Sequence, residues 1–232
     1  MALFAPLLRL SGGFLERLTG GVLARLELLW LGLHKDPAVL RCIRSIHRDN
    51  RGWPLASEGF LLHSLARAQT KVPGDYAEVG VFRGSSARLI CEGKGDRRLH
   101  LFDTFTGLPE GSPVDRGVFR PHQYACDRQS VEEYLASFPG VFFHEGLFPE
   151  STRGVANVEN ARYALAHFDV DLYESTRACL EFFYPRMTPG GVIVSHDYSF
   201  IPAVRQAFDE FMTDKPEGII ELPTSQCIVL KR

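Results

Sequence analysis

The sequence of 232 residues predicts an α/β fold with a mostly parallel sheet of seven strands, a C-terminal antiparallel hairpin and a helical N-terminal extension. After residue 72, short runs rich in β-forming residues alternate with segments of helical composition, as expected for parallel strands joined by helices on both faces of a sheet. The last two runs have no helix between them, so we expect them to pair antiparallel. Hydrophobic residues make up 45% of the chain and charged residues 23%, the balance of a globular protein with a sizeable core.

Residues 1–71 form the predicted N-terminal extension or lid, and residues 72–232 form the predicted cofactor-binding domain. Within the extension, apolar residues recur at helical spacing from Leu15 to Trp30. Charged residues interrupt them, so the stretch is too polar for a membrane span of about 20 apolar residues. Two interpretations stay open: a helix that covers the core or a second subunit, giving a homo-oligomer, and a helix on a membrane surface. In both cases we expect no integral contact with a membrane.

The predicted elements follow one another in a regular order. Seven strands are expected over residues 76–81, 99–105, 141–146, 163–171, 190–198, 218–223 and 226–232. Four helices are expected between them, over residues 85–94, 130–138, 175–187 and 203–212. Residues 106–130 are rich in glycine, proline and polar side chains, so we interpret them as a long loop or lid. Loops of this length within a compact domain usually have a function or are disordered.

Charge and cysteine content exclude several classes of partner and site. The formal net charge is -2 and is spread along the chain, so no basic patch is expected to bind nucleic acid. The five cysteines are scattered and lack a CxxC-like pair, which indicates neither a zinc site nor a set of disulfides. Reduced thiols in the cytoplasm are the simplest interpretation.

The segment EVGVFRGSS, residues 78–86, follows the first predicted strand and opens a helix. Gly80 and Gly84 permit a tight turn and close approach of a ligand, and the helix start at Ser85 offers N–H donors to an anionic group. A dinucleotide site would have a glycine where this segment has Glu78. This acid would repel a pyrophosphate but attract the ammonium and sulfonium groups of S-adenosylmethionine. A strand, turn and helix without a ligand are the alternative interpretation.

Two further turns are candidates for contacts with the same cofactor. Asp103 ends the second predicted strand, about 20 residues after Gly84, where doubly wound folds place an acid that binds ribose hydroxyls. Its alternative role is to cap the next turn. Glu145 and Gly146 end the third predicted strand and, from their position only, are expected over the adenine.

Acidic residues and a histidine end the fourth and fifth predicted strands. Asp169 and Asp171 end the fourth strand, and His196 and Asp197 end the fifth. Adjacent parallel strands place their carboxyl ends at one edge of the sheet, so we expect a group of oxygen ligands suited to Mg²⁺. Magnesium would hold the acceptor oxygen and lower the pKa of its hydroxyl, while a free carboxylate or imidazole takes the proton. Alternatively, Asp171 caps the next helix, and His196 is a ligand, a second base or a hydrogen-bonding core residue.

The segments AEVGVFRGSSA, LFDTFTGLPEG, GLFPEST, FDVDLYEST and GGVIVSHDYSF, in this order, resemble the macrocin O-methyltransferase family. That family acts on sugars of macrolide antibiotics, with relatives that act on other natural products. The resemblance runs from Val72 to the C-terminus. It implies a Rossmann-like class I methyltransferase fold, S-adenosylmethionine as methyl donor, dependence on Mg²⁺, and O-methylation of a hydroxyl on a small-molecule acceptor.

By this resemblance, Asp169 matches the first metal-binding aspartate of the family motif D-G-D-x-Y-x-S-T, and Asp171 matches the second, which looks like the general base. Asp197 matches the second acid of the motif D-D-Y. Val170 replaces the glycine of the first motif. His196 replaces the first acid of the second motif, so one hard oxygen ligand is missing. Three outcomes stay open: weaker magnesium binding, another metal such as Mn²⁺, or no metal.

Two other functions share some of these features. A nicotinamide-dependent dehydrogenase would show the same alternation of strands and helices, but Glu78 and the missing G-x-G-x-x-G motif argue against it. A non-catalytic scaffold that binds S-adenosylmethionine would tolerate the change at His196. The first interpretation is an O-methyltransferase. Its candidate catalytic residues are Asp171 and His196, and its candidate metal ligands are Asp169, His196 and Asp197.

Overall fold

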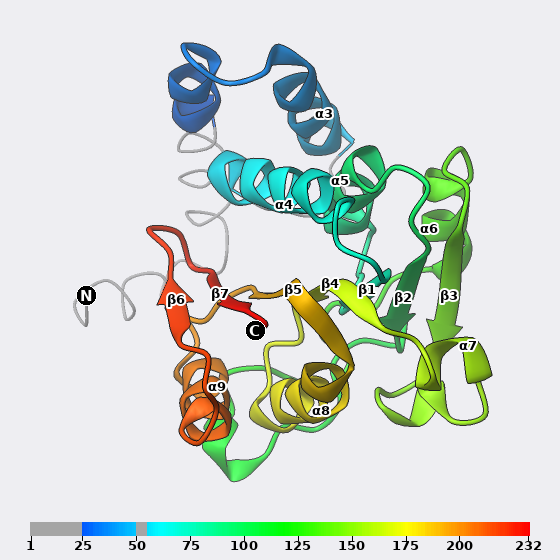
Figure 1. The fold of residues 1–232 in the computed structure, drawn as a ribbon, viewed down its shortest axis with the longest axis vertical. Coiled ribbons are helices and arrows are strands. Elements are labelled where there is room, and N and C mark those ends of the chain that lie inside the picture. Colours follow the sequence, from blue (N-terminus) through cyan, green and yellow to red (C-terminus); the bar gives the residue numbers. More distant parts are fainter. Residues whose placement is uncertain (1–24, 50–54) are drawn as a thin grey trace.

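The fold is that of a computed structural model, which describes residues 25–49 and 55–232 (Figure 1). The strands in this part of the chain are β1 (Asp75–Val79), β2 (Leu99–Asp103), β3 (Val141–Glu145), β4 (Tyr163–Phe168), β5 (Met187–Ser195), β6 (Ile219–Glu221) and β7 (Cys227–Leu230). They form one seven-stranded sheet in the order β3-β2-β1-β4-β5-β7-β6. Strands β1 to β5 are parallel, and β7 is antiparallel to both β5 and β6. The predicted parallel sheet and C-terminal hairpin are confirmed.

The centre of the sheet is covered on both faces. All residues of β1 and β4 are buried, as is typical of parallel strands between two layers of helices. At the edge, β3 is only partly buried. The order of the strands reverses between β1 and β4, because the chain moves outward to β3 and then crosses back. In open α/β sheets, ligands bind at the carboxyl ends of the strands beside such a reversal.

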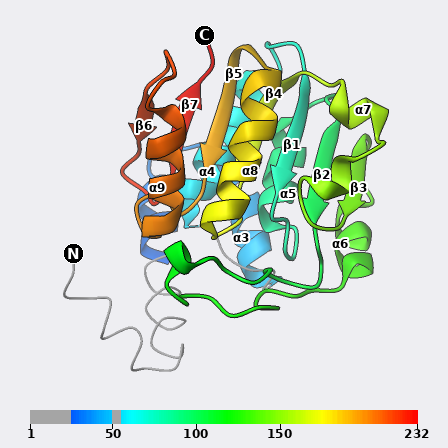
Figure 2. The same cartoon turned by 90° about the horizontal axis from the view of Figure 1, so that it is seen from below.

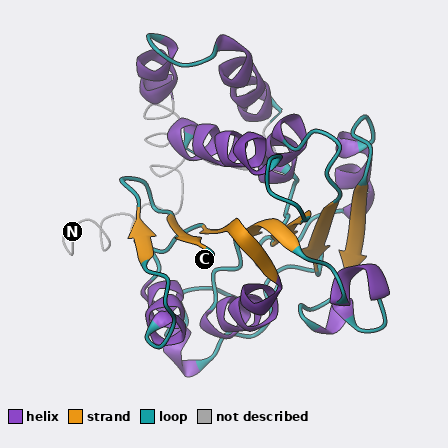
Figure 3. Cartoon of the chain, in the orientation of Figure 1, coloured by secondary structure: helices purple, strands orange, loops and turns teal. Residues whose placement is uncertain are grey.

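Helices pack on both faces of the sheet, as the sequence predicts (Figures 1 and 3). The helices after β1 are α5 (Ser85–Gly93), α6 (Arg128–Leu135), α7 (Ala156–Glu159), α8 (Tyr173–Phe183) and α9 (Pro202–Met212). Seen from below, α8 and α9 lie in front of the sheet (Figure 2). Their side of the core includes Phe168, Phe183 and Phe208, whereas Leu62, Ile90 and Leu101 belong to the core on the opposite side.

The boundary between the helix predicted over residues 175–187 and the fifth strand differs from the prediction, and this difference affects the site. The helix expected to reach residue 187 ends at Phe183, and a 3-10 turn that contains Pro185 follows it. Proline lacks the N–H that would continue an α-helix, which accounts for the change. Strand β5 therefore begins earlier than expected and ends at Ser195. His196 and Asp197 lie in the turn after the strand rather than on it.

The described part of the N-terminal extension is helical, as expected. It comprises a helix over residues 25–32, α3 (Pro37–Arg48) and α4 (Ala56–Gln69). Asp36 caps α3 by accepting a hydrogen bond from the Ala38 N–H at 2.8 Å, with proline at the first helical position. Apolar residues of α3 form a cluster with Ala56 of α4 and Leu89 of α5. Most of the amphipathic stretch that begins at Leu15 lies outside the described residues. Within the described ranges, no helix is long and apolar enough to cross a membrane.

Candidate functional site

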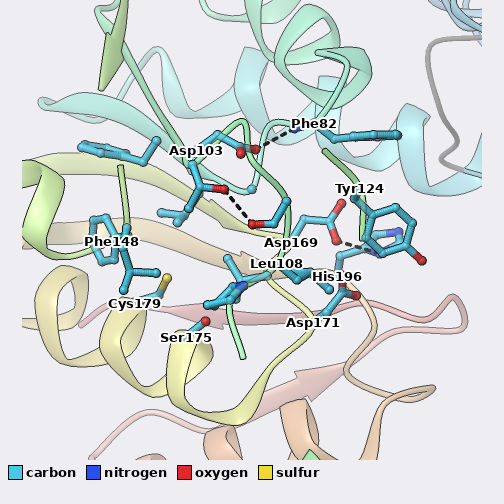
Figure 4. Close-up of a pocket in the computed structure, with 18 of the residues that line it drawn as sticks. Phe82, Asp103, Leu108, Tyr124, Phe148, Asp169, Asp171, Ser175, Cys179 and His196 are labelled. Carbon is cyan, nitrogen blue, oxygen red and sulfur yellow. Dashed lines mark hydrogen bonds and ion pairs between the residues drawn. The ribbon is translucent and has the colours of Figure 1, made fainter. Parts of the chain in front are cut away.

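A cavity of about 390 Å³ lies at the carboxyl ends of β1, β2 and β4 and beside the turns after β3 and β5 (Figure 4). Its lining is mainly apolar, with a few acidic groups and one histidine. The expected site residues that line it are Gly80, Asp103, Gly146, Asp169, Asp171, His196 and Asp197. The expected site residues that do not line it are Glu78, Gly84, Ser85 and Glu145. The cavity therefore joins the expected cofactor turn to the expected catalytic turns.

The first turn depends on two glycines with positive φ angles. Gly80 has φ of 85°, and a Cβ atom there would lie 1.9 Å from the carbonyl oxygen of Asp169. Only glycine lets the end of β1 approach the end of β4 this closely. Gly84 has φ of 84°, and a Cβ atom there would meet Val131 of α6 at 3.0 Å. Gly84 thus packs against α6, whereas Gly80 shapes the cavity.

Asp103 holds the backbone of this turn. Its Oδ2 atom accepts hydrogen bonds from the N–H groups of Val81 at 2.7 Å and Phe82 at 2.8 Å. Its Oδ1 atom accepts one from the Phe105 N–H at 2.7 Å. An ionised carboxylate has about four acceptor positions, so one is left for a ligand such as a ribose hydroxyl. The capping role and the ribose role are therefore compatible.

Glu78 lies inside the sheet rather than in the cavity wall. Its side chain is 0% exposed, and Oε1 lies 2.9 Å from Nδ1 of His167 on the neighbouring strand β4. Burial raises the pKa of Glu78, against the hydrogen bond from His167. Because Glu78 does not line the cavity, it could attract a cationic ligand there only through space and without a direct contact. The role of Glu78 in cofactor binding stays a prediction.

The acidic turns after β4 and β5 meet at one point. Nδ1 of His196 lies 2.7 Å from Oδ2 of Asp197 and 3.5 Å from Oδ1 of Asp169. One ligand atom from each of these three residues lies within 4.8 Å of the others. Burial raises the pKa of Asp169; His196 opposes this rise, and Asp197 adds to it. The predicted juxtaposition of these residues is thus present in the fold.

Glu58 of α4 is a member of this group that the sequence analysis missed. Its Oε2 atom lies 3.3 Å from Nε2 of His196, although the two residues are 138 positions apart. Its Oε1 atom accepts hydrogen bonds from the N–H and the hydroxyl of Ser225, which lies between β6 and β7. Burial alone would raise the pKa of Glu58, but the hydrogen bonds from His196 and Ser225 lower it to about 2. No motif marks this acid, because its partners are distant in sequence.

His196 is therefore surrounded by carboxylates. Burial alone would lower its pKa, but Asp169, Asp197 and Glu58 hold the pKa of His196 well above its usual value. A carboxylate faces each ring nitrogen, and this arrangement favours the doubly protonated, positively charged form of the imidazole.

Asp171 lies beside this group, two residues before α8 begins. Burial and the nearby carboxylates of Asp169 and Asp197 raise the pKa of Asp171 well above its usual value. Its φ angle is 60°, and Asp197 has φ of 58°, a region that residues other than glycine rarely occupy. Phe82 and Tyr124, which also line the cavity, have positive φ angles too. Strained backbone of this kind is concentrated at functional sites.

The loop expected over residues 106–130 covers one side of the cavity, and its helical end belongs to α6. Leu108 and Tyr124 of this loop line the cavity. The Leu108 N–H donates a hydrogen bond to the carbonyl of Gln123, the residue before Tyr124, at 2.9 Å. Gly146 completes the cavity from the turn after β3. Glu145 points elsewhere and forms an exposed ion pair with Arg128 at 2.9 Å.

Comparisons with known proteins identify a family and several related O-methyltransferases. Residues 62–222 match the family model described as Macrocin-O-methyltransferase (TylF), which is more than half of the chain. The chain is 31% identical over 203 residues to demethyldecarbamoylnovobiocin O-methyltransferase of Streptomyces niveus, covering 77% of this chain and 75% of that protein.

A second relative matches over a shorter segment. It is 8-demethyl-8-(2,3-dimethoxy-alpha-L-rhamnosyl)-tetracenomycin-C 4'-O-methyltransferase of Streptomyces olivaceus, 35% identical over 157 residues. The match covers 60% of this chain and 58% of that relative. Among solved structures, the O-methyltransferase NovP superposes with a TM-score of 0.66 and 25% identity, over 75% of this chain and 78% of that one.

Proposed function

The chain belongs to the macrocin O-methyltransferase family and has its Rossmann-like class I fold, and we propose that it transfers a methyl group from S-adenosylmethionine to a hydroxyl of a small molecule. The observation that carries this proposal is a cavity that joins the glycine turn after β1 to the acidic turns after β4 and β5. Such a cavity can hold a donor and an acceptor side by side, and positioning supplies much of the acceleration in a group transfer.

The donor is proposed to bind at the turns after β1, β2 and β3. Gly80, Asp103 and Gly146 line this part of the cavity, and Asp103 has an acceptor position for a ribose hydroxyl. Gly84 and Ser85 do not line the cavity, so the start of α5 would act on an anionic group of the donor only from a distance, through the helix dipole. Glu145, which is exposed, is the weakest of the expected donor contacts.

Asp171 is proposed as the general base. Its raised pKa makes it a stronger proton acceptor than an ordinary aspartate, and a catalytic base works best with a pKa near the working pH. The acceptor hydroxyl gives its proton to the Asp171 carboxylate as its oxygen attacks the donor methyl group. The carbon–sulfur bond breaks while the carbon–oxygen bond forms, and S-adenosylhomocysteine leaves. His196 is less suited to this task, because a carboxylate faces each of its nitrogens.

Magnesium, which the family resemblance implies, fits these residues poorly. Asp169 and Asp197 offer carboxylate oxygens, but His196 stands where a third acid is expected. Magnesium prefers an octahedral set of oxygen ligands, and imidazole suits other metals better. No step of the proposed reaction depends on a metal.

The acceptor is proposed to be a sugar-bearing or aromatic natural product. The relatives are named for action on novobiocin-type and rhamnosyl-tetracenomycin compounds. In this chain, Phe82, Leu108, Tyr124 and Phe148 provide an apolar wall for a ring. An apolar row on the helix over residues 25–32 is exposed and would suit a homo-oligomer. All five cysteines are free, which fits the reducing cytoplasm that we propose as the location.

Two measurements test this function. Calorimetry with S-adenosylhomocysteine should detect binding, and a donor-loaded sample should release S-adenosylhomocysteine when given glycosylated aromatic acceptors. Donor binding without release on any acceptor would favour the scaffold. Binding of a nicotinamide cofactor, in place of the donor, would favour the dehydrogenase.

A further inference from the structure

Both ring nitrogens of His196 face carboxylates. Nδ1 lies 2.7 Å from Oδ2 of Asp197, and Nε2 lies 3.3 Å from Oε2 of Glu58. An ionised carboxylate only accepts hydrogen bonds, so each nitrogen must carry a proton to bond with it. An imidazole with two N–H groups has no lone pair left for a metal.

Glu58 is fixed in this position from several sides. It is 2% exposed, and its oxygens also accept hydrogen bonds from the Leu55 N–H at 3.0 Å and the Ser225 hydroxyl at 2.6 Å. A buried carboxylate needs such partners, because an unpaired charge in the interior is costly. If His196 turned away to bind a metal through Nε2, Glu58 would lose its charged partner. The geometry therefore keeps His196 in its present orientation.

We infer that the imidazolium of His196, positioned by Glu58, is the cation of this site and takes the place of a divalent metal ion. This inference rests on the proposed methyl transfer. His196 lines the cavity beside Asp169 and Asp171, so its positive charge faces the place where the acceptor oxygen loses its proton to Asp171. The charge stabilises the developing alkoxide through a group whose position is already fixed before the reaction. Glu58 is a positioning residue and does not touch the acceptor.

A measurement of metal affinity tests this inference without depending on methyl transfer. Mn²⁺ is titrated into the full-length chain without donor, and the free ion is followed by electron paramagnetic resonance. The wild type should bind Mn²⁺ no better than a chain with Asp169→Asn. The double variant Glu58→Gln with His196→Asp supplies a third acid at position 196 and removes the buried carboxylate of Glu58 that would otherwise face it. It should bind Mn²⁺ at least about tenfold more tightly than the wild type. Tight binding by the wild type that is lost in Asp169→Asn would overturn the inference.

A second measurement does not depend on the folding of the double variant. In ¹⁵N NMR spectra of the wild type at about pH 7, both ring nitrogens of His196 should have the shifts of protonated nitrogens, with the signals assigned by their loss in His196→Asn. One unprotonated nitrogen would contradict the inference. Donor calorimetry and product release on the same samples test the proposed function separately. If the protein neither binds the donor nor releases S-adenosylhomocysteine, the proposed function is wrong. The Mn²⁺ and NMR results would still report whether His196 is protonated and whether a metal binds.

Discussion

The carboxylate of Asp115 accepts a hydrogen bond from the backbone N–H of Tyr173 at 2.8 Å, which fastens the long loop after β2 to the first residue of α8. Its other oxygen accepts bonds from the N–H and hydroxyl of Ser112. Asp115 is 5% exposed, and its negative charge lies at the positive end of the α8 dipole. Because Asp171 lies two positions before Tyr173, the same contact ties the loop to the proposed base.

Replacing Asp115 with alanine should loosen the loop. The Tyr173 and Ser112 N–H groups would lose their acceptor, at a cost of about 1–3 kcal/mol. Hydrogen exchange over residues 104–127 should become faster, and KM for the acceptor should rise more than kcat falls. Ser112→Ala is the control, because it removes one hydroxyl donor and leaves the bond to Tyr173. Equal exchange rates in the two variants would contradict the anchoring role.

Asp171→Asn should remove the proposed base while keeping the shape of the side chain. We expect kcat to fall by about 10²–10⁴-fold, since general base catalysis contributes about this much. The dissociation constant for S-adenosylhomocysteine should stay nearly unchanged, because the donor contacts lie on other turns. Single-turnover assays and calorimetry measure the two effects. A full loss of donor binding would mean that Asp171 contacts the donor and not the acceptor hydroxyl.

Asp103→Ala should weaken donor binding and the turn together. Three backbone N–H groups lose their acceptor, so the free energy of unfolding should drop by about 2 kcal/mol or more. Asp103→Asn retains one carbonyl acceptor and should lose less stability. In both variants the donor dissociation constant should rise if the ribose role is correct. An unchanged constant in a folded variant would leave Asp103 with the capping role alone.

Gly80→Ala should lower the free energy of unfolding far more than Gly117→Ala does. Both glycines have positive φ angles, 85° and 63°, so each substitution carries the strain of that backbone region, about 1 kcal/mol. Only at Gly80 does the new Cβ also collide with the Asp169 carbonyl oxygen, whereas no atom lies within 4 Å at Gly117. Urea unfolding should show a loss several times larger for Gly80→Ala. Similar losses would mean that the ends of β1 and β4 separate easily.

The stability contributed by Glu58 should depend on pH. Its pKa falls from the usual 4.5 to about 2 in the folded protein, so the stabilisation is present above pH 4.5 and is lost as the pH falls toward 2. The destabilisation caused by Glu58→Gln should therefore be about 2 kcal/mol smaller at about pH 3 than at about pH 6. Urea unfolding of both proteins at the two pH values measures it. A difference that does not change with pH would mean that Glu58 is not held as a carboxylate.

Local patterns were enough to predict most of the sheet. The runs that became β1 to β7 are short and apolar, and the connecting helices have regular spacing, so both signals lie within a few neighbouring residues. The convergence of Asp169, Asp171 and Asp197 followed from the geometry of parallel strands. The expected boundary at residue 187 was wrong because Pro185 ended the helix early.

Contacts between distant segments could not be predicted in this way. Glu78 was expected to face a ligand, but its pairing with His167 depends on the register between β1 and β4. Glu58 was missed because its partners belong to turns that follow β5 and β6, far along the chain. In both cases a single acidic residue carries no local sign of what will face it after folding.

The link from Glu58 to His196 and Ser225 also limits how this protein can be re-engineered or can diverge. Grafting a foreign N-terminal segment onto the chain, to alter its choice of acceptor, would discard the acid that balances the histidine. A change of His196 to aspartate alone would set its carboxylate against the buried carboxylate of Glu58. We therefore expect a substitution at position 58 to be tolerated better when position 196 is changed with it.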